Sequence, residues 1–251
     1  DGVWVLYLAD ANVEDVNELF VVDVSGPTPG TPIRLNDPLV SGRDVILTNW
    51  SPDSTRVLFL SDRDLDEVDE LFMVGVGGVA PVTPVKVNPS LPALRLVVNN
   101  DDNGFLWSPD GSWVAYRADP NVDGDYELFA APVDALGPGT PVRLNLPVPA
   151  GELVPNMVFS PDSQRIAFRA PTTLGTRIEL YVVELDGPTP SAPIPLAIPA
   201  IAAGAVSTNL LWYGNERVAF IGDLAVDGVF NAYVVDVTQS PAVPVQLNPP
   251  V

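Results

Sequence analysis

The chain of 251 residues contains no cysteine and no histidine, and Lys86 is its only lysine. Without cysteine the chain has no thiol nucleophile, no disulfide and no thiolate metal site. Without histidine it has no Ser-His-Asp triad, no imidazole base and no typical zinc site. These absences exclude many hydrolytic and metal-dependent chemistries, and we expect the chain not to be an enzyme.

Basic residues are scarce, with 12 Lys and Arg against 32 Asp and Glu, which gives a formal net charge of −20. A field of this sign repels polyanions, so we expect no nucleic-acid partner, whereas basic protein surfaces are suitable partners. The longest uncharged stretch, residues 187–215, contains five prolines and cannot form a membrane-spanning helix. We therefore expect no membrane insertion.

The sequence consists of one motif repeated five times. Its clearest marker recurs at spacings of 52, 57, 52 and 52 residues, as Glu18-Leu19-Phe20, Glu70-Leu71-Phe72, Glu127-Leu128-Phe129, Glu179-Leu180-Tyr181 and Asn231-Ala232-Tyr233. A period of this length indicates supersecondary units that bury their apolar faces by stacking on their neighbours. We place the repeats at about 1–41, 42–93, 94–150, 151–202 and 203–251, within a single domain spanning residues 1–251.

Each repeat contains four segments with strand character. The first ends at an aromatic residue, as in Val45–Trp50, and a Ser-Pro-Asp-Gly type I turn such as Ser108–Gly111 follows. The second strand, such as Val114–Tyr116, is β-branched and aromatic, and the third begins at the Glu-Leu-Phe marker. The fourth, such as Thr31–Asn36, carries a proline and a basic residue, which is typical of an outer edge strand. The pattern predicts an all-β fold, a β-propeller of four-stranded antiparallel blades with five repeats.

The first repeat is expected to lack its innermost strand. Asp1-Gly2 aligns with Asp110-Gly111, so the five repeats contain 19 strands where five full blades need 20. An unpaired strand edge promotes association. We therefore expect the ring to be completed by flanking sequence of a longer chain or by a neighbouring molecule.

The motif at residues 107–116, Trp-Ser-Pro-Asp-Gly-Ser-Trp-Val-Ala-Tyr, is followed by Asp-Gly-Asp-Tyr-Glu-Leu-Phe at 123–129. Together they resemble the WD-like propeller repeat of the TolB type, and the resemblance covers essentially the whole chain. It implies a β-propeller located outside the cytoplasm, in a periplasmic, cell-envelope or secreted protein, that acts as a protein-binding platform or accessory domain. The last repeat departs from the motif, because Tyr213–Glu216 replaces Ser-Pro-Asp-Gly, and its hairpin should differ.

The loop between the second and third strands is the best candidate for chemistry. In the first three repeats it places oxygen ligands at alternate positions, namely Asp10, Asn12, Asp62, Asp64, Asp66, Asp119, Asn121 and Asp123. Such spacing suits a hard cation, so Ca²⁺ is the one cofactor that the sequence suggests. The position of the bidentate Glu in a helix-flanked calcium loop holds Val21, Met73 and Ala130, which leaves the ligand set incomplete. Asp and Asn also favour tight turns, and that is the simpler interpretation.

One connection into an inner strand is five residues longer than its counterparts. The insertion contains Asn99, Asn100, Asp101, Asp102 and Asn103. Longer loops on a rigid scaffold often carry binding residues, so this segment is a candidate partner surface, and a solvated loop tip is the alternative.

Three functional hypotheses remain. The first is a non-enzymatic interaction or structural module that presents an acidic loop face to a protein partner or self-assembles. The second is a glycosidase-like propeller, which needs carboxylates on the inner strands, but these strands carry none. The third is the propeller domain of a larger peptidase whose catalytic part lies outside this chain, since the chain has no Gly-x-Ser-x-Gly motif. We expect the first, with the propeller domain of a larger hydrolase, peptidase or glycosidase, as the alternative.

Overall fold

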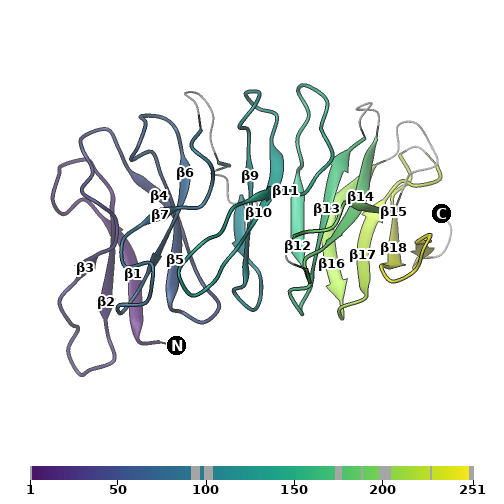
Figure 1. The fold of residues 1–251 in the computed structure, drawn as a ribbon. Helices are drawn as coiled ribbons and strands as arrows, with labels where there is room; N and C mark the ends of the chain where they lie inside the picture. The colour runs from purple at the N-terminus through teal and green to yellow at the C-terminus, as the bar shows by residue number, and fades with distance from the viewer. Residues whose placement is uncertain are drawn as a thin grey trace. The chain divides into compact units, whose positions relative to one another are not determined.

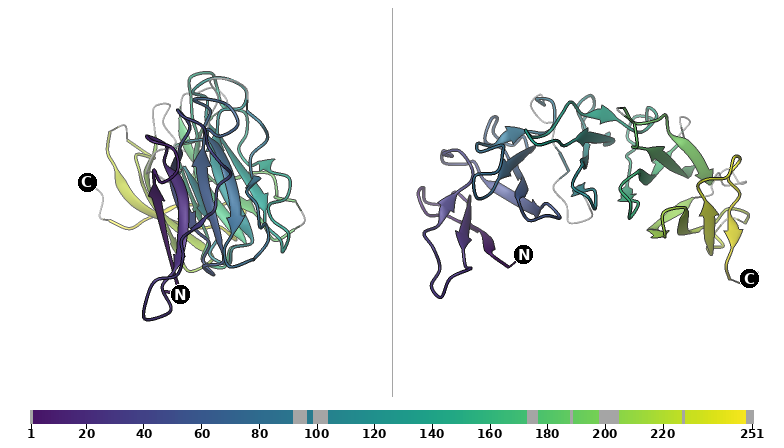
Figure 2. Two further views of the ribbon diagram at one scale, coloured as in Figure 1. Left: turned by 90° about the vertical axis from the view of Figure 1, so that its left-hand side faces the viewer. Right: turned by 60° about the horizontal axis from the view of Figure 1, so that its bottom comes forward.

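The computed structural model describes residues 2–91, 97–98, 104–172, 177–187, 189–197, 205–226 and 228–248. These residues form 19 β-strands in five antiparallel sheets (Figure 1), and Figure 2 shows the same sheets from two other directions. Among the described residues, no helix has the length and apolarity needed to cross a membrane.

Four of the sheets have four strands, and the first has three, in the order β1-β2-β3. The first sheet comprises β1 (Trp4–Ala9), β2 (Glu18–Asp23) and β3 (Ile33–Arg34). The second comprises β4 (Val45–Trp50), β5 (Arg56–Ser61), β6 (Glu70–Gly75) and β7 (Val85–Lys86). The third comprises β8 (Phe105–Trp107), β9 (Trp113–Ala118), β10 (Glu127–Pro132) and β11 (Val142–Arg143). The fourth comprises β12 (Asn156–Phe159), β13 (Arg165–Pro171), β14 (Ile178–Glu184) and β15 (Ile194–Ala197). The fifth comprises β16 (Val206–Tyr213), β17 (Arg217–Gly222), β18 (Asn231–Asp236) and β19 (Val245–Gln246).

This arrangement confirms the predicted fold. The chain is an all-β propeller of four-stranded antiparallel blades in five repeats, and the first repeat lacks the innermost strand. The strands lie in chain order across each sheet, so the fourth strand of every repeat is at an edge, as its proline and its short length require.

The chain divides into two compact units, Asp1–Tyr116 with Ala131–Pro141, and Arg117–Ala130 with Val142–Val251. The first unit contains the first and second sheets, and the second unit contains the fourth and fifth. Each unit is considered by itself below.

The Ser-Pro-Asp turns have the predicted hairpin geometry. Ser54 and Gly111 each donate a backbone N–H to the carbonyl of the serine three residues earlier, at 2.9 Å. In the second sheet, the Ser51 hydroxyl donates to Asp53 at 2.6 Å and accepts the N–H of Arg56 at 2.9 Å. The fourth turn position has positive φ, +60° at Ser54 and +75° at Gly111, which explains why glycine suits it.

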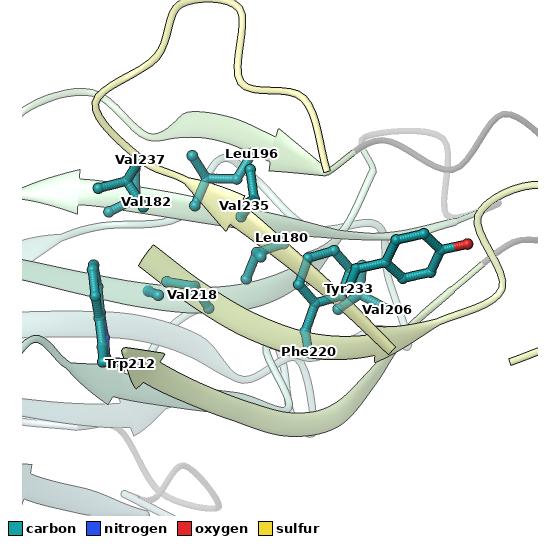
Figure 3. Packing of buried hydrophobic residues seen from close by; sticks show 11 residues of the cluster. Leu180, Val182, Leu196, Val206, Trp212, Val218, Phe220, Tyr233, Val235 and Val237 are labelled. Carbon is teal, nitrogen blue, oxygen red and sulfur yellow. The ribbon is translucent and has the colours of Figure 1, made fainter. Parts of the chain in front are cut away.

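Apolar cores form where consecutive sheets meet. In the first unit, Leu19 and Val21 of the first sheet pack with Val57 and Phe59 of the second. In the second unit, Leu180 and Val182 of the fourth sheet belong to one cluster with Phe220 of the fifth, which Figure 3 shows. The Trp212 indole N–H donates to the carbonyl of Val158 in the preceding sheet at 3.1 Å. Trp212 therefore packs the fifth sheet against the fourth.

Candidate functional site

The candidate site is the set of loops between the second and third strands. We call residues 10–17, 62–69 and 119–126 the acidic loops, and residues 223–230 are the corresponding segment of the fifth repeat. Every one of them connects two long, neighbouring strands of one sheet, so both ends of each loop are held by a ladder of antiparallel pairs.

The first Asp of the loop builds a turn. Asp10, Asp119 and Asp223 each accept the backbone N–H of the residue five positions later, at 3.3, 3.0 and 3.3 Å. That later residue has positive φ, +59° at Asp15 and +80° at Gly124. These bonds support the turn interpretation, because a carboxylate that accepts its own backbone N–H fixes the loop without a ligand.

A second set of bonds ties the loops to the segment that enters an inner strand. Asp62 accepts the N–H of Asp44 at 2.8 Å, and Asp44 in turn accepts the N–H of Asn17 at 2.6 Å. In the third repeat, Asp125 accepts the N–H of Gly151 at 2.6 Å. Carboxylates thereby satisfy backbone donors on both sides of the loop.

The remaining candidate metal ligands have different surroundings. The amide groups of Asn12 and Asn121 donate to the buried carboxylates of Glu18 and Glu127. Asp64 accepts from Arg63, whereas Asp66 and Asp123 are exposed.

Within the part of the chain that the structure describes, no three acidic side chains converge into a metal-binding group. The calcium site stays a prediction. The predicted partner surface at Asn99, Asn100, Asp101, Asp102 and Asn103 lies outside the described residues.

A polar trio built on a buried Glu and a buried Asn recurs below each acidic loop, and we call it the Glu clasp. It consists of the Glu that opens the third strand, the basic residue of the fourth strand 16 positions later, and the Asn two positions beyond that, as Glu18/Arg34/Asn36, Glu70/Lys86/Asn88 and Glu127/Arg143/Asn145. The ion pairs measure 2.7, 2.6 and 2.7 Å.

The Asn closes the clasp by bonding to the third strand. Asn36, Asn88 and Asn145 accept the backbone N–H of the leucine after the Glu at 2.6, 2.7 and 2.7 Å. Each also donates its amide to the carbonyl of the residue that follows it. From the sequence, the basic residue was interpreted only as typical of an edge strand. Its constant separation of 16 positions from the Glu was the signal that could have revealed the ion pair.

The fourth and fifth sheets carry altered versions of the clasp. Pro195 stands at the basic position of the fourth sheet, and Glu179 accepts the Tyr181 hydroxyl at 2.7 Å instead. Burial, together with this hydrogen bond, raises the pKa of the Tyr181 phenol above its usual value. In the fifth sheet the pair is neutral, since Gln246 donates its amide to Asn231 at 3.2 Å.

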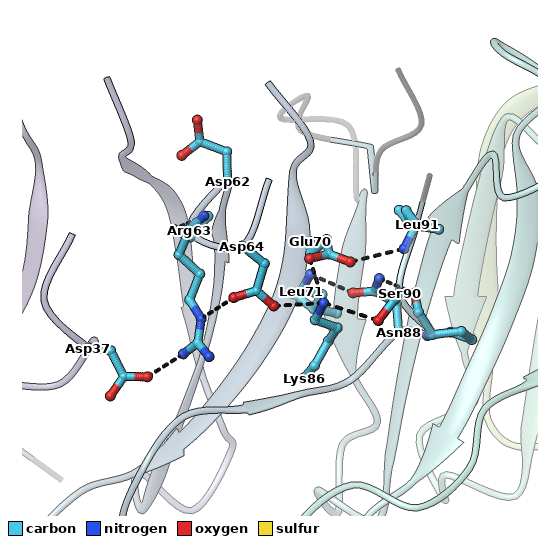
Figure 4. A network of polar contacts seen from close by, with 12 residues as sticks. Asp37, Asp62, Arg63, Asp64, Glu70, Leu71, Lys86, Asn88, Ser90 and Leu91 are labelled. Atoms are coloured by element: carbon cyan, nitrogen blue, oxygen red, sulfur yellow. Dashed lines mark hydrogen bonds and ion pairs between the residues drawn. The ribbon is translucent and has the colours of Figure 1, made fainter. Parts of the chain in front are cut away.

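The second sheet extends its clasp into the acidic loop, as Figure 4 shows. Lys86 contacts both Glu70, at 2.6 Å, and Asp64, at 2.8 Å. Arg63 forms ion pairs with Asp64, at 2.9 Å, and with Asp37, at 2.6 Å. Its guanidinium lies 4.5 Å from the centre of the Phe72 ring.

These contacts change two pKa values. Burial opposes ionisation of Asp64, but hydrogen bonds from Lys86 and Arg63 outweigh it and hold the pKa below the usual 3.8. Burial likewise opposes the charge on Lys86, but its bonds to Asp64 and Glu70 raise the pKa above 10.5. Both groups are therefore charged at neutral pH.

Two buried arginines also hold the strands below the loops. Arg117 donates to the carbonyls of Val154 and Pro155 at 3.3 and 3.0 Å, and Arg169, at the corresponding position of β13, donates to the carbonyl of Val206. Burial lowers the pKa of Arg169 to about 10. Neither arginine was predicted from the sequence.

No protein-family model and no curated protein matches this sequence. Solved structures of prolyl oligopeptidase B from Galerina marginata share its fold. One, bound to a 35mer hydrolysis and macrocyclization substrate, is 13% identical with a TM-score of 0.55, and the match covers 93% of this chain and 34% of that one. The apo protein is 12% identical with a TM-score of 0.55, covering 97% and 36%.

A structure from a study of two prolyl endopeptidases is 12% identical with a TM-score of 0.54, covering 98% of this chain and 35% of that one. The chain thus spans about a third of the length of the solved structures that it matches. At these identities the likeness concerns the fold.

Proposed function

We propose that this chain is a non-enzymatic propeller module of a protein outside the cytoplasm, and that its acidic loops bind a basic protein surface. The main observation behind the proposal is that the loop carboxylates fall into two groups, one buried and the other exposed. Asp119 and Asp62 are buried and bond to backbone, whereas Glu14 and Asp66, at corresponding positions of two repeats, are exposed. Among the described residues, no hydrogen bond or ion pair uses the carboxylates of Glu14 and Asp66.

Two further features support this proposal. The loops are fixed by their own turns and by the Glu clasps, and a rigid scaffold lowers the entropic cost of binding. A net charge of −20 favours cationic partners. The location outside the cytoplasm follows from the resemblance of the repeats to the TolB type.

The test compares two double variants of equal net charge. Glu14→Gln/Asp66→Asn removes two loop charges, and Asp186→Asn/Glu216→Gln removes two exposed charges at the opposite ends of the strands. The probe is a labelled 20-residue peptide of alternating Lys and Ser, measured by fluorescence anisotropy in 0.15 M salt. We expect the loop variant to weaken binding several-fold and the control to change it less than twofold. Equal weakening by both would mean that net charge alone attracts the peptide.

The comparisons favour a second candidate, the propeller domain of a larger hydrolase. The match covers 93 to 98% of this chain but only 34 to 36% of prolyl oligopeptidase chains, which suits a propeller that accompanies a catalytic domain. Sequencing the coding region on both sides of this chain tests the candidate. A hydrolase domain in the same reading frame would favour it, and flanking repeats or a secretion signal alone would favour the first proposal.

A further inference from the structure

A cavity lies between the Ser-Pro-Asp turn that precedes β5 and the equivalent turn that follows β8. Its volume is about 280 Å³, and its lining includes Asp53, Arg56, Trp107, Asp110 and Asp134. All residues that line it belong to the first compact unit. The turns lie at the opposite ends of the strands from the acidic loops, so the cavity is separate from the site described above.

The junction between the first and second sheets shows what fills the equivalent space there. Trp4 stands at the position of Arg56, and Gly77 stands at the position of Asp134. A Cβ atom at Gly77 would lie 3.5 Å from Cζ2 of Trp4, so the indole lies over this position. The cavity therefore combines a different residue on each of its two sides.

The junction between the fourth and fifth sheets offers a second comparison. Arg165 is equivalent to Arg56, and it donates to the carbonyl of Asn215, in the turn of the next sheet, at 3.2 Å. Arg56 instead donates its Nε to the carbonyl of Ala80, in its own repeat, at 2.8 Å. Because Arg56 bonds back to its own repeat, space remains between the two turns.

The lining of the cavity is acidic. It contains three carboxylates and one guanidinium, which gives a net charge of −2. Burial opposes ionisation of Asp53, but hydrogen bonds from its own turn and the charge of Arg56 outweigh it and hold the pKa below the usual 3.8. Arg56 thus compensates the charge of Asp53, and the excess negative charge comes from Asp110 and Asp134.

These two carboxylates are held in place by their own turns. Oδ1 of Asp110 accepts the hydroxyls of Ser108 and Ser112, each at 2.7 Å. Oδ1 of Asp134 accepts the backbone N–H of Leu136 at 2.7 Å. Among the described residues, no hydrogen bond uses Oδ2 of Asp134. A ligand therefore meets acceptors that are already ordered, which lowers the entropic cost of binding.

Trp107 adds an apolar wall to the cavity. It is 8% exposed, and its indole N–H donates to the carbonyl of Asn49 at 3.5 Å. An indole face attracts a cation and packs against an aliphatic chain. Pockets for drug-sized ligands measure roughly 300–1,000 Å³, so this smaller cavity suits one aliphatic chain with a charged head. Among the described residues, no three acidic side chains converge into a metal-binding group, which favours a ligand that spans the carboxylates.

We propose that this cavity binds a primary alkylammonium group, with the aliphatic chain on Trp107 and the ammonium beside Asp110 and Asp134. A free amine and the lysine side chain of a protein share this chemistry. The site is independent of the acidic loops and goes beyond the proposed function.

The experiment follows the chemical shifts of the intact ¹⁵N-labelled chain while a ligand is added at low, constant ionic strength. The probes are n-pentylamine as a free amine and Nα-acetyl-lysine methylamide as a lysine side chain. Nα-acetyl-norleucine methylamide supplies the aliphatic chain without the ammonium. We expect saturable shifts of the Trp107 indole N–H and the Ser112 amide with an amine, and none with the norleucine compound. Binding of n-pentylamine alone would identify a free amine as the ligand, and binding of both amines would identify a lysine side chain.

A pair of matched variants tests the role of the carboxylate. Asp134→Asn keeps the Oδ1 acceptor for Leu136 but removes the charge, and it should weaken amine binding about three- to fivefold. Asp23→Asn removes the same charge from a residue that does not line the cavity and that accepts the N–H of Ser25 in a similar turn, at 2.8 Å. This control should leave amine binding nearly unchanged.

Three results would overturn the proposal: shifts that do not saturate, an equal response to the norleucine compound, or equal weakening by Asp134→Asn and Asp23→Asn. Glu14 and Asp66 do not line the cavity, so these outcomes are separate from the peptide-binding test of the acidic loops.

Discussion

The Glu clasp offers the sharpest test of the energetics, because the fifth sheet contains its neutral equivalent. Glu18→Asn, Arg34→Gln and the double variant convert the charged pair of the first sheet into the Asn231 and Gln246 pair of the fifth. The three variants form a double-mutant cycle.

The magnitude follows from burial. The Glu18 side chain is 1% exposed and that of Arg34 is 30% exposed. Removing Glu18 leaves the Arg34 guanidinium and the Asn12 amide without their acceptor. Loss of one partner of a buried pair costs about 3–5 kcal/mol, and because Arg34 keeps some solvent we expect about 2–3 kcal/mol for Glu18→Asn. The double variant leaves no unpaired charge, so we expect it to cost only about 1 kcal/mol.

The assay is urea unfolding followed by tryptophan fluorescence, since Trp4 and Trp50 pack against the core next to this clasp. Asp37→Asn is the control, because Asp37 is 50% exposed in its ion pair with Arg63 and its loss should cost less than about 1 kcal/mol. The reasoning is refuted if the double variant costs the sum of the two single variants, or if Glu18→Asn costs no more than the control.

Three further predictions concern the acidic loops. Asp64 has a lowered pKa in the folded state, so its contribution to stability is full above the unfolded pKa near 3.8 and is lost as the pH falls through the lower folded value. Asp64→Asn should therefore reduce stability at pH 7 and flatten its decline below pH 4, as acid titration of the unfolding midpoint would show. The melting temperature should be the same in millimolar Ca²⁺ and in chelator, and a rise of several degrees with Ca²⁺ would establish the calcium site instead. Gly124→Ala, at φ +80°, should destabilise by about 1 kcal/mol, whereas Glu67→Gly, at φ +58°, should stabilise slightly, both measured by urea unfolding.

The strands and hairpins were predictable because their signals are local. The apolar run of β5 specifies a strand, and Ser51, Pro52 and Asp53 specify a turn whose bonds all lie within a few residues. Because the motif recurs, the same strand and turn assignments apply to the equivalent residues of the other repeats.

The Glu clasp was not predicted because its partners meet only after the third and fourth strands pair. Glu18 looked like part of a marker, and Arg34 looked like a solvated edge residue. The difference in burial between equivalent positions of two repeats was equally hidden. Val5 and Val57 are the same residue at the same place in the repeat, and only the presence of a neighbouring sheet decides which one is buried.

The inward placement of the basic residues has a kinetic consequence. Arg34 and Lys86 lie against buried glutamates, and Arg117 and Arg169 are buried and donate to carbonyls, so these four of the 12 cationic side chains present little positive charge at the surface. An approaching protein therefore experiences a surface more uniformly anionic than the composition suggests. Long-range attraction would accelerate its encounter with this chain and orient it before contact, and that acceleration would fall steeply with ionic strength.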